Sequence, residues 1–476
     1  MENFIKLTDG YKITHWPQYP KGTQKVYAYF ESRGGQFKLI TFFGLQAILK
    51  KYMLGQVVTK EHIDEAEDFS AKYFGNANYF NRSGWEYILT KHGGHLPVVI
   101  KAVPEGTVVP AHNALMTVEN TDEKCYWLTN YIETLLVQAW YPCTVATQSW
   151  YMKQKILDYL KLTGDPSLID FKLHDFGFRG VSSVETAGMG GMAHLVNFLG
   201  TDTIQGITYA DKYYSAGVCG HSIPASEHST ITSWGRDKES QAYKNMLTQY
   251  PTGLVACVSD SFDVYNACEN LWGGELRMKV LEREGTLVIR PDSGDPPKVI
   301  NKILGILGEQ FGASKNEKGF KVLNPKVRVI QGDGIDYEMI GTILKSMTEA
   351  GWSADNIAFG SGGGLLQKLN RDTCKFAFKC SSVTVEGKER DVYKEPITDP
   401  GKNSKSGRLS LIPVTIRGEV DDDQWTYKTV SQTTRDDDML EVVYRDGKLT
   451  QDHRFNDIKQ RVKTTGEAVK KFEGLN

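Results

Sequence analysis

Apolar residues follow two different periodicities along the 476-residue chain. From Phe43 to Tyr52 they recur at i, i+3 and i+4, which predicts amphipathic helices between Phe42 and about His92. The runs KVYAYFESR, from Lys25, and LPVVIKAV, from Leu96, instead predict strands. Further helices are expected from residue 124 to about 159. The sequence therefore predicts an N-terminal α+β segment over residues 1–150.

The next two hundred residues alternate apolar strands with helical segments. Near-continuous apolar strands separated by helices indicate a parallel sheet that is covered on both faces. Seven or so units favour an irregular α/β barrel over residues 151–385, and a doubly wound open sheet is the alternative. The predicted strands are FKLHDF (171), TIQGIT (203), LVACVSD (254), TLVIRPD (286), KVRVIQGD (326), NIAFGSG (356) and FAFKCSS (376).

Residues 386–476 return to strands and polar loops. Asp446-Gly447 between two strand-like runs predicts a hairpin. We expect this tail to pack with the N-terminal segment. The predicted fold class is thus α/β, an irregular α/β barrel with an additional α+β domain built from the N- and C-terminal segments.

Composition excludes some classes of function. The chain is 40% hydrophobic and 11% aromatic, so a sizeable core is expected. Its net charge of -2 argues against bulk nucleic-acid or membrane-surface binding. The seven cysteines are scattered without a CxxC pair, which suits reduced core residues. Because we find no signal peptide and no membrane-spanning run, we expect a soluble, cytoplasmic protein.

Polar residues recur after the predicted strands. In a parallel α/β barrel the loops at the carboxyl ends of the strands build the active site. Each residue alone has a structural explanation, and their recurrence at one topological position is what indicates a site. They are His174, Asp175, Phe176 and Arg179; Asp202, which lies just before its predicted strand; His228, in a long loop; and Asp260, Asp263, Arg290, Asp292, Ser293, Gly332, Asp333, Gly334 and the run 361–364.

The run GSGGG, residues 360–364, is the strongest phosphate signal. Glycines let backbone N–H groups converge on an anion, and a following helix adds its positive end. A flexible loop is the alternative. Asp292 and Asp333 suit ribose hydroxyls or Mg²⁺, or simply cap helices. His228 is a catalytic base, a nucleophile or an ordinary loop residue.

One dinucleotide-like motif is set aside. Residues 188–193, GMGGMA, fit GxGxxA, but they lie about a dozen residues beyond the nearest strand and inside a predicted helix. The dinucleotide fingerprint requires a strand to lead directly into the glycines. No Walker A, HExxH or GxSxG pattern is present.

Long motifs connect the chain to a known family. They include LTDGYKITHWPQYP, HDFGFRGVSSVETAG, EHSTITSWG, VSDSFDVYNACE, IRPDSG, NIAFGSGGGLLQKLNRD and KSGRLSL, and run in order from about residue 8 to 411. The chain closely resembles the nicotinamide phosphoribosyltransferases, type II phosphoribosyltransferases related to nicotinate phosphoribosyltransferase. Beyond about residue 412 the resemblance fades, and the role of the tail is not predicted.

The resemblance implies a slot for the substrate ring. In that family nicotinamide stacks between a Phe and a Tyr, which match Phe176 and Tyr11, the Tyr coming from the partner subunit of a homodimer. The amide-reading aspartate matches Asp202. An acceptor carboxylate there favours a carboxamide over a negatively charged nicotinate.

The resemblance also implies phosphate and catalytic residues. Arg290 and Asp292 match the pair that contacts pyrophosphate and ribose, and His228 matches the histidine that ATP phosphorylates. Asp260 as the partner that orients this imidazole is our own hypothesis, and Mg²⁺ at Asp292 and Asp333 is expected. The implied phosphate residues are Arg179, Gly332, Asp333, Gly362, Gly363 and Arg371 from one chain, Arg33, Lys394 and Lys402 from the other, and Lys379.

Two positions depart from the family. We expect Ser where Ala256 and Ala377 stand, so each lacks a hydroxyl and the affinity changes more than the activity. The sequence thus predicts a homodimeric nicotinamide phosphoribosyltransferase of NAD salvage that uses nicotinamide, 5-phosphoribosyl 1-pyrophosphate, Mg²⁺ and ATP. A nicotinate phosphoribosyltransferase, another sugar-phosphate barrel enzyme and a non-catalytic binding or signalling protein are the alternatives.

Overall fold

The computed structural model of the chain describes residues 2–398, 403–416, 424–431 and 435–472. They fall into two compact units. Unit 1 comprises Met1–Thr147, Lys212–Ala216 and Asn370–Asn476, and unit 2 comprises Gln148–Asp211 and Gly217–Leu369. Each unit is built on a sheet of its own.

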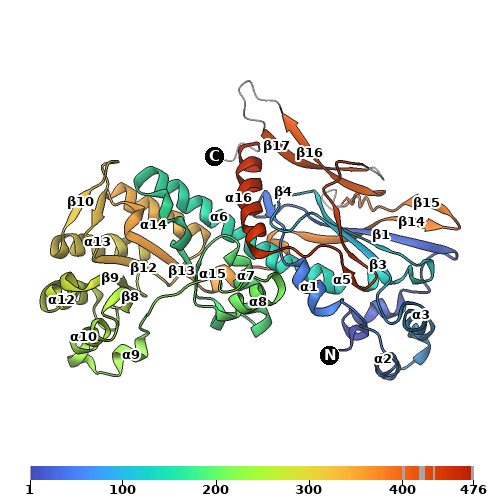
Figure 1. Ribbon diagram of the computed structural model, residues 1–476, viewed down its shortest axis with the longest axis horizontal. Coiled ribbons are helices and arrows are strands. Elements are labelled where there is room, and N and C mark those ends of the chain that lie inside the picture. Colours follow the sequence, from blue (N-terminus) through green and yellow to red (C-terminus); the bar gives the residue numbers. More distant parts are fainter. Residues whose placement is uncertain (1, 399–402, 417–423, 432–434, 473–476) are drawn as a thin grey trace. The chain divides into compact units, whose positions relative to one another are not determined.

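Unit 2 is built on a parallel sheet whose six described strands have the order β7-β6-β13-β12-β9-β8. Figure 1 labels four of them, β8, β9, β12 and β13. Parallel strands need crossover connections, and helices supply most of them. The strands are β6 (Leu173–Asp175), β7 (Gly200–Thr201), β8 (Thr252–Val258), β9 (Glu284–Arg290), β12 (Val327–Gln331) and β13 (Ile357–Ser361). A hairpin of β10 (Ala313–Lys315) and β11 (Lys321–Leu323) follows α13.

An extended segment bridges the two edge strands of this sheet. His221 pairs in parallel with Gly200 of β7, and Ala225 pairs in parallel with Ala256 of β8. The Ala256 N–H also donates to the carbonyl of Pro224 at 2.9 Å. Single bridges therefore complete the ring in place of a full strand, which explains why the barrel is irregular.

Helices surround the barrel strands of unit 2. Inside the barrel, Ala256, Val288 and Ile330 form a buried cluster against which Phe176 packs. They come from the neighbouring strands β8, β9 and β12, at positions that face the same side of the sheet. The helices are α7 (Val184–Leu195), α8 (Ile204–Tyr214), α9 (His228–Thr232), α10 (Glu239–Gln249), α11 (Val264–Asn266), η9 (Ala267–Glu275), α12 (Arg277–Glu282), α13 (Pro296–Phe311), α14 (Tyr337–Glu349) and α15 (Gly363–Leu366).

Unit 1 is built on an antiparallel sheet in the order β15-β14-β1-β5-β3-β18-β19. This order places strands from both ends of the chain in one sheet, as expected for a domain formed by both terminal segments. Its strands are β1 (Thr23–Ser32), β3 (Val98–Ala102), β5 (Ala114–Asn120), β14 (Phe376–Val385), β15 (Lys388–Asp391), β18 (Glu441–Arg445) and β19 (Lys448–Leu449).

Two strand pairs and several helices complete the described part of unit 1. The pairs are β2 (Leu39–Thr41) with β4 (Val108–Pro110), and β16 (Leu409–Ile416) with β17 (Gln424–Ser431). The helices are α1 (Leu45–Tyr52), α2 (Lys60–Phe74), α3 (Arg82–His92), α4 (Leu128–Tyr131), α5 (Glu133–Leu136), the start of α6 (Trp140–Thr163), and α16 (Phe455–Phe472).

The tail packs with the N-terminal segment, as predicted. β18 pairs with β3 in antiparallel register. The predicted hairpin turn is confirmed, since β18 pairs with β19 and both Asp446 (φ 49°) and Gly447 (φ 86°) adopt left-handed backbone conformations.

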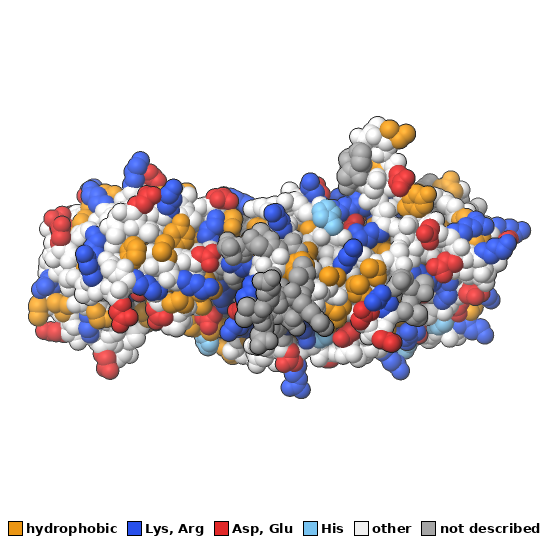
Figure 2. Space-filling view, turned by 90° about the horizontal axis from the view of Figure 1, so that it is seen from above, with side chains coloured by type: hydrophobic (Ala, Val, Ile, Leu, Met, Phe, Trp, Pro, Cys, Tyr) orange, Lys and Arg blue, Asp and Glu red, His pale blue; other side chains and the backbone are white. Residues whose placement is uncertain are grey.

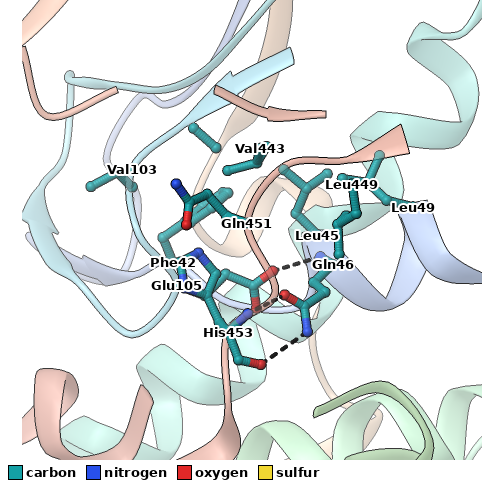
Figure 3. Close-up of a pocket in the computed structure, with 11 residues that line it drawn as sticks. Phe42, Leu45, Gln46, Leu49, Val103, Glu105, Val443, Leu449, Gln451 and His453 are labelled. Atoms are coloured by element: carbon teal, nitrogen blue, oxygen red, sulfur yellow. Dashed lines mark hydrogen bonds between the residues drawn. The ribbon is translucent and has the colours of Figure 1, made fainter. Parts of the chain in front are cut away.

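A buried carboxylate connects several segments of unit 1 (Figure 3). Glu105 accepts hydrogen bonds from the Gly44 N–H at 2.8 Å, the Gln46 N–H at 2.5 Å and the Tyr214 hydroxyl at 2.7 Å. It therefore caps the start of α1. Burial raises the pKa of Glu105, while these three donors lower it. A cavity of only about 10 Å³ remains beside it, which is room for at most about one water molecule.

Two predicted barrel strands are wrong. FAFKCSS forms β14, which pairs with β1 in the antiparallel sheet of unit 1 and not with the barrel. TIQGIT is mostly helix α8, and the strand before it is only Gly200–Thr201. FAFKCSS was misassigned because a short apolar run does not distinguish a parallel strand from an antiparallel one. TIQGIT was misassigned because β-branched residues are tolerated in a helix when tertiary packing favours the helix.

The described residues contain no helix that is long and apolar enough to cross a membrane. On the face drawn in Figure 2, acidic and basic side chains are interspersed, in keeping with the net charge of -2. The cytoplasmic location stays a prediction.

Candidate active site

The strand ends of unit 2 enclose a cavity of about 920 Å³. This volume is large enough for a nucleotide-sized ligand, since ligand sites usually enclose roughly 300–1,000 Å³. Most of the residues that line it carry polar or charged side chains. The predicted site residues that line it are Phe176, Arg179, Asp202, His228, Arg290, Asp292, Gly332, Asp333 and Gly362.

A glycine in the neighbouring strand β13 makes room for the ring of Phe176. A Cβ at Gly360 in β13 would lie 2.0 Å from Cε2 of Phe176, a distance that real carbons never reach. A Cβ at Gly332 would lie 3.5 Å from the same atom. The Phe176 N–H donates to the Ser361 carbonyl at 3.0 Å and so fixes the start of the loop. No sequence pattern predicts that this ring requires a glycine at position 360.

Asp202 immediately follows β7 and is exposed to the cavity. The prediction had placed it before a strand, but the residue occupies the carboxyl end of one, as the other rim residues do. The Ser222 hydroxyl donates to Asp202 Oδ1, and the Asp202 N–H donates to the Asp175 carbonyl at 2.9 Å. Ser222 was not predicted, because no motif connects residues twenty positions apart.

His228 and Asp260 lie together, as the hypothesis about them requires. His228 begins α9, and its Nε2 lies 3.0 Å from Asp260 Oδ1. The other oxygen of Asp260 accepts hydrogen bonds from the Asp292 N–H at 3.0 Å and from the Ser293 hydroxyl at 2.7 Å. The side chain of Asp260 is 4% exposed and that of His228 is 49% exposed. A buried carboxylate held by two hydrogen bonds thus contacts a half-exposed histidine in the cavity wall.

Arg290 and Asp292 form a two-pronged ion pair at the end of β9. The two hydrogen bonds measure 3.2 Å from Nε to Oδ1 and 2.6 Å from Nη2 to Oδ2. The guanidinium carbon also lies 5.7 Å from the centre of the Phe176 ring. This bidentate geometry fixes both side chains in the cavity wall, where the arginine presents fixed donors to an anion.

The glycine run connects β13 to α15, between a strand and a helix as predicted. A Cβ at Gly364 would lie 2.3 Å from the carbonyl oxygen of Ile335, so only glycine fits there. Gly363 lies close to Gly180, the last residue of the short helix that carries Arg179. The structure therefore places the predicted glycine loop beside the predicted arginine.

The remaining predicted residues belong to unit 1. Tyr11 is 60% exposed, which leaves its ring accessible. Burial lowers the pKa of Lys379; Glu133 opposes that shift, and Arg33, Lys394 and Arg371 add to it. Four cations therefore influence one another in this unit. Arg33 donates to Glu31 at 2.9 Å, while its Nη2 is buried without a hydrogen-bond partner. Lys402 lies outside the described residues.

The two departures from the family lie in strands. Ala256 in β8 is 4% exposed and belongs to the apolar cluster inside the barrel beside Phe176. Ala377 in β14 is the register partner of Glu31 in β1. A serine at position 256 would present a hydroxyl to an apolar interior. The structure gives Ala377 no direct role in the cavity of unit 2.

Asp292 and Asp333 both line the cavity and suit a magnesium ion that is carried by a phosphorylated substrate. Mg²⁺ prefers one or two carboxylates together with phosphate oxygens and water. Arg290 already neutralises Asp292, so Asp333 is the better ligand of the two. Elsewhere in the described residues, His92, Asp122 and Cys125 lie within 4.8 Å of one another, but both Asp122 oxygens accept protein hydrogen bonds.

Comparison with known proteins connects this geometry to a family. The nicotinate phosphoribosyltransferase (NAPRTase) family matches residues 171–448, and the nicotinamide phosphoribosyltransferase N-terminal domain matches residues 3–100. A nicotinamide phosphoribosyltransferase of Xanthomonas campestris is 50% identical over 96% of this chain and 98% of its own length. The chain belongs to the nicotinamide phosphoribosyltransferase family.

Other members and related folds agree with this assignment. The nicotinamide phosphoribosyltransferase of Acinetobacter baylyi is 32% identical over 98% of both chains. Crystal structures of a nicotinate-nucleotide pyrophosphorylase from Pyrococcus furiosus and of human nicotinic acid phosphoribosyltransferase share the fold. The Pyrococcus structure has a TM-score of 0.60 at 15% identity, and the match covers 98% of this chain and 97% of that one. The human structure has a TM-score of 0.57 at 14% identity, and the match covers 97% of this chain and 94% of that one.

Membership in the nicotinamide phosphoribosyltransferase family confirms the predicted resemblance and the type II phosphoribosyltransferase fold. It also confirms the predicted enzyme class, a pentosyltransferase. The roles of the individual site residues stay predictions.

Proposed function

We propose that this enzyme transfers the phosphoribosyl group of 5-phosphoribosyl 1-pyrophosphate to nicotinamide, giving nicotinamide mononucleotide and pyrophosphate in NAD salvage. The observation that carries the proposal is the presence of an aromatic face and an acceptor carboxylate, Phe176 and Asp202, on adjacent strand ends of one cavity. The name shared by the Xanthomonas and Acinetobacter relatives supports it.

The ring and its carboxamide make different demands on the slot. An electron-poor aromatic ring stacks on an aromatic side chain, which Phe176 supplies. A carboxamide N–H needs an acceptor, and Asp202 is one. Since Ser222 occupies Oδ1, we assign Oδ2 to the carboxamide. A nicotinate carboxylate would instead face a like charge, which supports amide selection.

The transfer needs no covalent bond to the protein. The bond between C1 of the ribose and the pyrophosphate oxygen breaks, and its electron pair leaves with pyrophosphate. The lone pair of the pyridine nitrogen forms the new C1–N bond, which leaves the ring positively charged. Arg179 and Arg290 line the cavity and would stabilise the leaving charge. Fixed charges and alignment supply most of the rate in such a reaction.

Mg²⁺ is the cofactor we propose. Bound to the pyrophosphate, it would neutralise charge on the leaving group. Asp333, and Asp292 where Arg290 releases it, would hold the ion from the protein side. This assignment is supported by their positions in the cavity wall.

ATP stimulation through a phosphohistidine is the second part of the proposal. The contact of His228 Nε2 with Asp260 favours the tautomer with hydrogen on that nitrogen, so the Nδ1 lone pair is available. Nδ1 would attack the γ-phosphorus of ATP, with the bond to the ADP oxygen breaking. The partial exposure of His228 supports access of the nucleotide.

A homodimer with shared sites is the third part. We assign Tyr11, Arg33, Lys394 and Lys402 to the site of the partner subunit. The exposed ring of Tyr11 supports this assignment, because a stacking partner must be accessible. Mixing Tyr11→Ala with His228→Ala dimers should then restore some activity. No restoration, despite demonstrated subunit exchange, would contradict the shared site.

Turnover of radiolabelled nicotinamide and nicotinate, each with and without ATP, tests the proposed function. We expect nicotinamide to be preferred and ATP to increase its turnover. Asp202→Asn should reduce the preference, because a neutral amide repels nicotinate less. His228→Ala should abolish the effect of ATP, and an unchanged effect would refute the phosphohistidine assignment.

Nicotinate is the alternative substrate, since the family that matches residues 171–448 carries its name. A preference for nicotinate in the same assay would overturn the choice made here. If the protein turned over neither nicotinamide nor nicotinate in the presence of Mg²⁺ and 5-phosphoribosyl 1-pyrophosphate, the result would favour a non-catalytic protein.

A further inference from the structure

A second carboxylate lies behind the proposed ring slot. Asp175 ends β6, directly before Phe176, and is fully buried at 0% exposure. Its Oδ1 accepts the Gly177 N–H at 2.7 Å. The carboxyl therefore holds the turn that follows Phe176. Neither the family assignment nor the proposed reaction gives this buried acid a role.

The same residue also contacts the turn that carries Asp202. The Asp175 carbonyl accepts the Asp202 N–H at 2.9 Å. The next residue, Thr203, is also 0% exposed. Its hydroxyl lies close enough to the Asp175 carboxyl to lower the pKa of that carboxyl, although no hydrogen bond of normal geometry joins the two groups. Asp175 thus bonds to the Asp202 turn through its backbone carbonyl and to the Phe176 loop through its carboxyl.

Two buried polar atoms at this junction are unpaired. Among the described residues, Asp175 Oδ2 and Thr203 Oγ1 each lack a partner at hydrogen-bonding distance. Leaving such atoms unpaired is unfavourable, so an unpaired buried group in a native fold needs an explanation. A small movement of the Asp202 turn toward Asp175 would pair both atoms at once.

We propose that Asp175 is a positioning residue for nicotinamide: its carboxyl fixes the Phe176 loop and, through Thr203, draws in the Asp202 turn when the carboxamide binds. The inference rests on the proposed function, because it assigns the carboxamide to Asp202. Asp175 does not touch the substrate. It sets the distance between the stacking ring and the acceptor carboxylate.

Steady-state kinetics of four variants test the proposal. Asp175→Ala should raise the KM for nicotinamide about tenfold, since one hydrogen bond to a charged group is lost, and change the KM for 5-phosphoribosyl 1-pyrophosphate less than about twofold. Asp175→Asn keeps an acceptor for Gly177 and should stay within about threefold of wild type. Thr203→Val, of nearly equal volume, should raise only the nicotinamide KM, whereas Thr203→Ser should not.

Asp170→Ala is the matched control. Asp170 lies before the other end of β6, where it pairs with Lys153 on the surface at 2.9 Å, and its loss should change neither KM. Three outcomes would each overturn the proposal. Asp175→Ala could raise the KM for both substrates equally, Asp175→Asn could raise the nicotinamide KM as much as Asp175→Ala does, or Thr203→Val could leave the nicotinamide KM unchanged. If Asp175→Ala does not fold, the Asn and Thr203 variants decide.

Hydrogen exchange separates this inference from the proposed function. Without any substrate, Asp175→Ala should speed exchange of the peptide that contains Gly177, while Asp175→Asn should not. Wild-type protein that is inert toward nicotinamide would remove the proposed function and, with it, the substrate role. Active wild-type protein with unchanged exchange in Asp175→Ala would remove the positioning role alone.

Discussion

Two groups of carboxylates in this molecule have opposite surroundings. In unit 1, Glu105 is buried, accepts three hydrogen bonds and has only about 10 Å³ of empty space beside it. In unit 2, Asp202 and Asp333 lie at the wall of a cavity of about 920 Å³. A carboxylate whose acceptors are used by the fold stabilises structure. One that keeps an oxygen toward open space is available for ligands.

The largest effect should come from Arg290→Ala. This change removes a cation from the cavity and leaves Asp292 without its partner, and we expect kcat/KM to fall about 1,000-fold, or about 4 kcal/mol. Steady-state assays measure it. Arg435→Ala, which breaks an exposed pair with Asp437 at 2.6 Å, is the control. A loss below tenfold would show that the cavity wall does not stabilise the leaving group.

Among the substitutions that affect stability, Glu105→Gln should lower the free energy of unfolding the most. Its amide would present a donor where the Gly44 and Gln46 N–H groups need acceptors, so we expect about 2–4 kcal/mol loss in the free energy of unfolding. Chemical denaturation measures it. Well below the unfolding temperature, kcat/KM should stay near wild type. A large loss of activity in the folded variant would break the distinction between the two groups.

Asp175→Asn should show a pH-dependent gain in stability. Burial is the main cause that raises the pKa of Asp175 from 3.8 to about 6. The negative charge of Asp202 also raises this pKa, while the Gly177 N–H and Thr203 lower it. The folded state thus keeps the proton to higher pH than the unfolded state. The contribution of Asp175 to the free energy of unfolding is therefore fully present below its pKa in the unfolded chain, 3.8, and is lost as the pH rises through its folded-state pKa of about 6.

Thermal melts at two pH values check this sign. At pH near 7.5 the Asn variant should be more stable than wild type by about 1–3 kcal/mol, and near pH 4 the difference should vanish. Asp175 would then be a buried carboxyl beside the slot whose ionisation costs stability and which accepts one backbone hydrogen bond, whereas Glu105 accepts three hydrogen bonds that hold the start of α1. Equal gains at both pH values would contradict the raised pKa.

The smallest effect should come from Gly360→Ala. The new methyl would displace the Phe176 ring, so we expect the nicotinamide KM to rise about tenfold with a smaller change in kcat. Gly305→Ala in α13, where a Cβ meets nothing within 4 Å, is the control and should be neutral or slightly stabilising. Equal kinetics of both variants would mean that Gly360 does not define the slot.

Sequence reasoning found the rim because strand ends share one edge of a parallel sheet. Phe176, Arg290 and Asp333 each follow an apolar run, and each lines the cavity. The same reasoning misassigned FAFKCSS, because the apolar pattern of an antiparallel central strand equals that of a barrel strand. Ser222 was also missed, because the fold brings it to Asp202 and no sequence spacing indicates that the two residues meet.

The sequence by itself determined the helices and strands of strong periodicity, the family and the residues after the strands. Local patterns and long motifs carry that information. Only the tertiary structure decided that residues 221–225 complete the barrel, that Gly360 makes room for Phe176, and that Asp175 lies behind the slot with an unpaired oxygen. These features depend on contacts between segments far apart in the chain, which no local pattern encodes.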